Sequence, residues 1–186
     1  MTAGLAGRRV DAADAAQARF PRRLVAAVEE RVEAVLRDAG CSALVCAAAC
    51  GADLVALGVA QRCGIDAWVV LPYAVAEFRR SSVVDRGEEW GALFDTAVEQ
   101  AEELGRLSIL GLSVDDDNAY PATNAAILDK AVSLSNGDSA STLAIAVWDG
   151  PLSGRTDYTA DFVEAARVRG IRVESVPILE DHEPAR

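Results

Sequence analysis

Short apolar runs alternate with amphipathic helical patterns along this chain, and this alternation constrains the fold more than any other feature. Most of the runs carry no charged residue, which is typical of strands that are buried on both faces of a parallel sheet. Strands are predicted at 42–49, 66–73, 107–112, 142–148 and 171–178, with a short first strand near Leu5. Helices are predicted at 21–38, 53–63, 88–104, 122–135 and 159–170, and polar irregular chain at 74–87. The alternation predicts a Rossmann-like α/β fold with three layers and a doubly wound, mainly parallel sheet.

The length and hydrophobic content favour one domain. The chain has 186 residues, of which 51% are hydrophobic, so it can build a sizeable core. It contains no internal repeat and no linker-like stretch. We expect residues 1–178 to form a single domain and residues 179–186 to form a flexible C-terminal tail.

The charge of the chain excludes some classes of partner. A formal net charge of −11 does not suit broad nucleic-acid binding, which needs a basic surface. The sequence contains no run of 18 apolar residues, so no membrane-spanning helix is predicted. The N-terminus is a poor secretory signal. We therefore expect a cytoplasmic protein with no membrane partner. An anionic ligand would have to be held by a few locally placed arginines.

The segment CAAACGAD at 46–53 raises the question of a metal or redox site. The four cysteines form no CxxC pair, and the single histidine, His182, lies in the predicted tail, so no metal site is expected. Along a strand, Cys46 and Cys50 would be separated by roughly 13 Å, too far for a disulfide. The cysteines are therefore predicted to be small core residues. Cys50 falls at a helix start, which can favour a thiolate, and a redox role for it stays open.

In open parallel sheets, ligands bind beyond the carboxyl ends of the strands, where the strand order reverses. The loop after the second predicted strand holds Gly51 and Asp53. The glycine would let the backbone approach a ligand closely. Asp53, in the first helical turn, would repel phosphate. It would either accept hydrogen bonds from hydroxyls such as those of ribose, or cap its own helix.

Arginines cluster in or near the same strand-end loops, and their planar donor groups suit phosphate or carboxylate. They are Arg8, Arg9, Arg19, Arg79, Arg80 and Arg155.

The loop 148–161 carries two glycines together with Thr156 and Thr159. It would be either a phosphate-binding loop or an ordinary connection with Thr159 as N-cap. The aromatic residues Tyr73, Phe78, Trp90 and Tyr120 would either stack on a base or fill the core. Walker A, GxGxxG and GxSxG motifs are absent, and no histidine is placed for a catalytic triad.

Three blocks of the sequence resemble the SLOG superfamily, which includes the LONELY GUY and SMF/DprA families. They are GRRVDA…RFP at 7–21, AAACGADLVALGVAQRCGIDAWVVLPY…EFRRSSVVDRGEEW at 47–90, and VWDGPLSGRTDYTADFVEAARVRG at 147–170. The blocks resemble the signature of a prokaryotic, nucleotide-sensor-like branch of that superfamily. The resemblance implies a pocket for a nucleotide-derived ligand, such as an ADP-ribose-like or cyclic ADP-ribose-like molecule or a nucleoside phosphate.

The resemblance and the arginine-bearing loops together predict a set of ligand-binding residues. They are Gly7, Arg8, Asp11, Arg19, Cys50, Gly51, Asp53, Arg79, Ser82, Gly154, Arg155, Thr156 and Thr159. The hydrolase motif PGGxGTxxE is not intact, because Asp157 and Tyr158 precede Thr159 in place of the paired glycines. Asp161 only roughly matches the catalytic glutamate.

These departures favour a binding or sensor domain without a cofactor over an enzyme. One alternative is nucleotide N-glycosidic hydrolysis, with Asp53 or Asp161 as the acidic group. Another is a protein-interaction module that binds no small molecule. As partner of a sensor we expect a second copy of the chain, in a homodimer, or a separate effector protein.

Overall fold

The computed structural model describes residues 1–151 and 156–178, and within them a single six-stranded sheet. The strands are β1 (Thr2–Gly7), β2 (Ala43–Cys46), β3 (Asp66–Leu71), β4 (Leu107–Ile109), β5 (Thr142–Trp148) and β6 (Arg172–Pro177). Their order is β4-β3-β2-β1-β5-β6, and every neighbouring pair is parallel. The Rossmann-like α/β fold predicted from the alternating pattern is confirmed.

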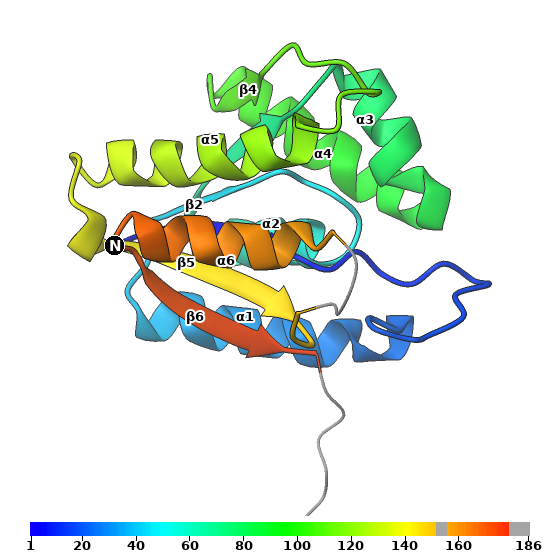
Figure 1. Cartoon of the computed structure of the whole chain (residues 1–186), viewed down its shortest axis with the longest axis horizontal. Helices are drawn as coiled ribbons and strands as arrows, with labels where there is room; N and C mark the ends of the chain where they lie inside the picture. The colour runs from blue at the N-terminus through cyan, green and yellow to red at the C-terminus, as the bar shows by residue number, and fades with distance from the viewer. Residues whose placement is uncertain (152–155, 179–186) are drawn as a thin grey trace, which may run out of the picture.

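Helices cover both faces of the sheet, which produces the three layers (Figure 1). The longer helices are α1 (Val25–Asp38), α2 (Ala52–Cys63), α3 (Val75–Ser82), α4 (Glu89–Glu103), α5 (Ala119–Leu134) and α6 (Tyr158–Val168). Short 3-10 turns occupy Arg22–Leu24, Val84–Arg86 and Ser139–Ser141. Helices α1, α2 and α4 share one apolar core with the sheet, whereas α5 and α6 share a second core on the opposite face.

The first strand lies at the centre of the sheet. β1 pairs with β2 on one side and with β5 on the other, from Thr2 opposite Thr142 to Gly7 opposite Val147. Its sequence, TAGLAG, is composed mostly of small residues, so α5 packs closely on it. A Cβ built on Gly4 would lie 3.3 Å from Cγ2 of Ile127. This is the strand predicted near Leu5.

Several local predictions differ from the structure. The strand predicted at 107–112 ends at Ile109, and the helix predicted at 122–135 begins at Ala119. The predicted strand at 42–49 ends at Cys46, because the backbone turns at Ala48, where φ is +76°. The prediction of irregular chain at 74–87 is wrong, since α3 occupies most of it with Phe78 and Ser82 buried four residues apart on one face. A helix so short, with one large apolar residue, gives a weak periodic signal.

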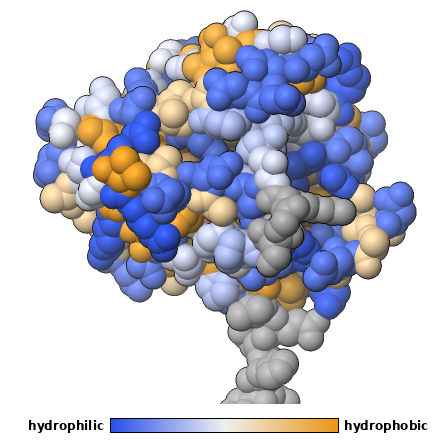
Figure 2. Space-filling model, in the orientation of Figure 1, coloured by the Kyte–Doolittle hydropathy of each residue, from blue (hydrophilic) through white to orange (hydrophobic). Residues whose placement is uncertain are grey.

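The molecular surface seen in Figure 2 is mostly polar, with apolar residues in small separate patches. No helix in the described part of the chain is both long and apolar enough to cross a membrane. The predicted C-terminal tail, 179–186, lies outside the described residues.

Candidate functional site

A cavity of about 330 Å³ opens where the chain order of the strands reverses, beside the carboxyl end of β1. Its wall comes from the end of β1, the loops after β2 and β3, the first turns of α5 and the start of α6. Six of the predicted ligand-binding residues line this cavity: Gly7, Arg8, Asp53, Ser82, Thr156 and Thr159. The strand-end rule therefore points to the edge of the sheet at which this cavity lies.

The other predicted residues lie elsewhere. The described residues Asp11, Arg19, Cys50, Gly51, Arg79 and Asp161 are outside the cavity lining. Gly154 and Arg155 fall in 152–155, outside the described residues. Arg79 pairs with Asp95 on α4, with nitrogen–oxygen distances of 2.8 and 3.0 Å, rather than facing the cavity.

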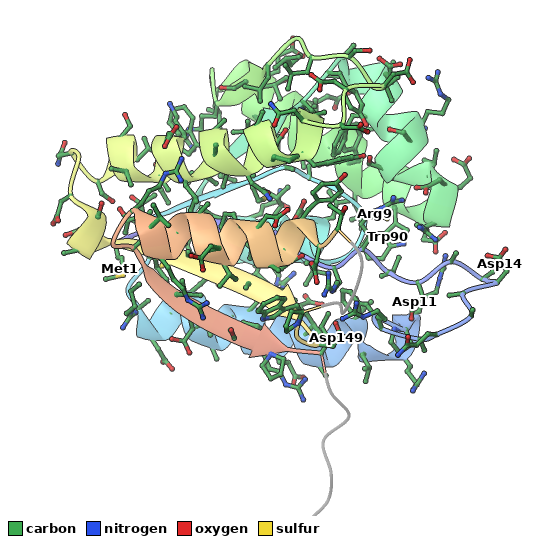
Figure 3. The ribbon with its side chains drawn as sticks, viewed as in Figure 1. Met1, Arg9, Asp11, Asp14, Trp90 and Asp149 are labelled. Carbon is green, nitrogen blue, oxygen red and sulfur yellow. The ribbon has the colours of Figure 1, made fainter. Side chains whose placement is uncertain are left out.

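Asp11 has a structural role in the loop after β1. Its carboxylate accepts hydrogen bonds from the backbone N–H groups of Arg19 and Phe20, at 3.0 to 3.1 Å. These bonds close the long loop that carries Asp14 away from the sheet (Figure 3). The same view places Arg9, Asp11 and Asp149 at the end of the molecule opposite Met1, which is the end toward which the strands run.

Two arginines and two aspartates form a balanced ionic cluster at the cavity edge. We call Arg8, Arg19, Asp149 and Asp157 the Arg8–Arg19 cluster. The Arg8 guanidinium binds both carboxylate oxygens of Asp157, at 2.6 and 2.7 Å, and its Nε donates to Asp149 at 3.2 Å. Arg19 donates to both oxygens of Asp149, at 2.6 and 2.5 Å. Both arginines also donate to the carbonyl of Gly150. Two positive charges thus face two negative ones.

Asp157, and not Thr159, is the N-cap of α6. Its Oδ1 accepts hydrogen bonds from the backbone N–H groups of Thr159 and Ala160, at 3.1 and 3.2 Å. Asp157 is buried and lines the cavity. The prediction of Thr159 as N-cap is therefore wrong, because an aspartate two residues earlier reaches the free amides of the first turn.

The two predicted ligand-approach glycines instead contact the chain itself. A Cβ on Gly51 would lie 2.7 Å from the backbone N of Val10 and 2.8 Å from the carbonyl oxygen of Arg8. A Cβ on Gly7 would lie 2.5 Å from Cβ of Ala52. These positions must be glycine because the loop after β1 is pressed against the start of α2. The close approach fixes Arg8 and Arg9 at the cavity.

Asp53 is a buried acid in the cavity wall. Burial raises the pKa of its carboxyl to about 7, although the N–H of Ala49 and the charge of Arg9 act in the opposite direction. Oδ2 accepts from that N–H at 3.0 Å. The N-cap of α2 is Gly51, so Asp53 does not cap its own helix. Its carboxylate instead accepts a hydrogen bond from the backbone of the turn before the helix. It can exchange a proton near neutral pH.

The cysteines are all free, as the spacing predicts. Cys50 is buried, and its thiol accepts a hydrogen bond from Nε of Arg9 at 3.4 Å. Burial raises the pKa of Cys50 even though Arg9 lowers it, which opposes the thiolate that a helix start would favour. Among the described residues, no group of three or more His, Cys, Asp or Glu side chains could hold a metal ion.

Aromatic and amide side chains from α5 and α6 complete the wall. Tyr120 and Tyr158 face each other with ring centroids 5.0 Å apart. The Tyr120 hydroxyl lies 3.2 Å from Oγ of Ser82, and burial raises the pKa of this phenol. Asn124 donates to the carbonyl of Tyr158 at 2.7 Å and so ties α5 to α6. Sequence reasoning missed Asn124 and Tyr158. In the sequence, these positions are indicated only by the polar residues at one end of the helical pattern that became α5.

The aromatic residues proposed to stack on a base fall into two groups. Tyr73 and Trp90 are buried in the core and absent from the cavity lining. Phe78 lines the cavity but is 1% exposed, so its ring is held by the core. Of the four, Tyr120 remains as a residue that can contact a flat ligand.

The sheet order and the strand-end cavity define a Rossmann-like domain, and a comparison with solved structures agrees. The chain is similar to DNA processing protein A (DprA) from Streptococcus pneumoniae, with a TM-score of 0.58 and 13% sequence identity. The match covers 98% of this chain and 52% of that chain, so the chain spans about half the length of the protein it matches. No protein-family profile and no curated protein matches the chain. At this identity the likeness shows the fold alone, and that fold is the one that the SLOG resemblance implies.

Proposed function

We propose that this chain is a binding or sensor domain for a nucleotide-derived small molecule, held in the cavity beside β1. The observation that carries the proposal is the set of polar side chains, from the loop after β1 and from or near the starts and ends of α2, α3, α5 and α6, that converge on one cavity. A volume of about 330 Å³ falls within the range of small-molecule sites. The SLOG-like sequence blocks support a ligand of the ADP-ribose, cyclic ADP-ribose or nucleoside phosphate type.

The chemistry of the wall suits the parts of such a ligand. Asp53, Ser82 and Asn124 offer acceptors and donors for sugar hydroxyls and base edges. Tyr120 and Tyr158 offer ring surface for a flat heterocycle. The proposal includes a cytoplasmic location and a partner that receives the signal, which is either a second copy of the chain or a separate effector protein.

The proposal predicts thermal stabilisation of the protein by at least one member of a nucleotide panel. The panel contains ADP-ribose, cyclic ADP-ribose, AMP and adenosine. At a ligand concentration of about 100 times Kd, stabilisation of about 2.7 kcal/mol is expected. Ala47→Leu fills the cavity and should abolish the shift, because Ala47 is part of its wall. Ala92→Leu, on the exposed side of α4, should leave it unchanged. A panel without any shift would favour an interaction module instead.

A second candidate function, hydrolysis of the N-glycosidic bond of a nucleotide, is favoured by one observation. Asp53 lies in the cavity wall with a pKa of about 7, which suits a general acid. Asp161 is exposed and outside the lining, so the structure leaves Asp53 as the stronger candidate. Chromatography should show free base released by the wild type and by Asp161→Asn, and none by Asp53→Asn. Intact nucleotide after long incubation of the wild type would exclude the activity.

A further inference from the structure

We propose that Asp157 determines ligand specificity by filling the position of a ligand phosphate at the α6 side of the cavity. The part of the ligand that lies against α6 would then be uncharged, such as a sugar hydroxyl or a base amino group. The inference rests on the proposed function for the identity of the cavity as a binding site. Its evidence is the set of donors around the Asp157 carboxylate.

Asp157 already engages the groups that would bind an anion. The backbone N–H groups of Thr159 and Ala160 point from the first turn of α6, where helices attract phosphate. Both donate to Oδ1 of Asp157. The two terminal nitrogens of Arg8, which form the planar pair suited to phosphate, donate to Oδ1 and Oδ2 of the same carboxylate. A phosphate would have to displace a covalently attached carboxylate from all four donors.

Among the residues that the structure describes, the charges around Asp157 balance and leave no positive excess for a second anion. The remaining Nε of Arg8 donates to Asp149, which also pairs with Arg19. The side chains of Arg8 and Asp157 are 12% and 4% exposed, so their charges are only weakly screened by water. A phosphate placed beside Asp157 would meet a like charge in a region of low dielectric. Repulsion of this kind discriminates against a wrong ligand as effectively as added contacts favour a right one.

Arg9, which also lines the cavity, has different partners from Arg8. Arg9 is part of the wall and pairs with a single carboxylate, Asp85, among the ion pairs of the described residues. Its Nε faces a neutral thiol, that of Cys50. Asp53, whose pKa is about 7, is the other acid that interacts with the charge of Arg9. An anionic group on the ligand would therefore meet fewer directly bonded carboxylates at Arg9 than at Arg8. The two arginines differ in this way although they are adjacent in the sequence.

Inorganic phosphate provides a probe that does not depend on the organic ligand. In wild-type protein, titration with phosphate at constant ionic strength should leave the amide NMR signals of Thr159 and Ala160 unchanged. Asp157→Asn retains a good N-cap side chain and removes the charge. The affinity of this variant for phosphate should exceed that of the wild type by at least about tenfold, which corresponds to about 1.4 kcal/mol of binding free energy. Asp157→Ser, also a good N-cap, serves as a second variant. Asp161→Asn makes the same charge change on the same helix and should gain nothing.

The outcomes separate this inference from the proposed function. Phosphate-dependent shifts at Thr159 and Ala160 in the wild type would overturn the inference, because Asp157 would not be excluding an anion. A folded Asp157→Asn without improved phosphate binding would overturn it as well. A negative nucleotide panel together with phosphate binding by the variant would remove the proposed function and keep the exclusion of anions by Asp157.

Discussion

Replacing Arg8 with methionine is expected to lower the free energy of unfolding by about 3 to 5 kcal/mol, the usual cost of breaking a buried ion pair from one side. Methionine keeps much of the side-chain volume but leaves Asp157 as a buried carboxylate without its bidentate partner. Urea denaturation of the two proteins at neutral pH measures the difference.

Two further variants test the cause of the Arg8 effect. Adding Asp157→Asn to Arg8→Met should restore much of the lost stability, because the double variant no longer buries a carboxylate that has lost its bidentate pairing with Arg8. Arg167→Ala removes an arginine whose partner, Glu164, is as exposed as it is, so it should change stability by less than about 1 kcal/mol. Equal losses in Arg8→Met and in the double variant would show that packing, and not charge, is responsible.

The second large effect concerns the pH dependence of stability through Asp53. The folded carboxyl has a pKa of about 7, whereas the ordinary value is 3.8, so between these values the folded state keeps a proton that the unfolded state loses. The stabilisation is complete below the unfolded pKa and is lost as the pH rises through the folded pKa. At 1.36 kcal/mol per unit, the loss between about pH 5.5 and about pH 8 is roughly 2 kcal/mol.

Denaturation curves of wild type and Asp53→Asn across this pH range isolate the contribution, because other titrating groups cancel in the difference. The stability of the wild type relative to the variant should fall by roughly 2 kcal/mol as the pH rises. A flat difference for Asp53→Asn would mean that the carboxyl is ionised throughout the range.

The fold was predictable because its evidence is distributed over the whole chain. Central strands of a parallel sheet are buried on both faces, so β2, β5 and the second half of β3 stand out independently as apolar runs. The exceptions have local causes. Four of the six residues of β1 are Ala or Gly, so the strand resembles a loop in composition. α3 has one large buried residue, Phe78, and the chain around it is polar.

The lining of the cavity was only partly predictable. The rule that ligands bind beyond the carboxyl ends of parallel strands identifies the loops concerned, but not which of their side chains point into the cavity. It located Asp53 and Ser82 correctly at the cavity. It could not show that Arg8 is occupied by two carboxylates or that Arg79 is held by α4, since both depend on partners far away in sequence. A sequence shows that an arginine is charged, but it does not show which carboxylates pair with that arginine in the folded protein.

The central position of β1 also determines when the domain can be completed during synthesis. The strand at the N-terminus must wait for β5, about 140 residues later, before its second edge is paired. Contacts so distant in sequence slow folding, and unpaired strand edges promote association in the meantime. The cavity is bounded by elements from both halves of the sheet, from the end of β1 to the start of α6. A nascent chain therefore cannot complete this cavity before α6 has been translated.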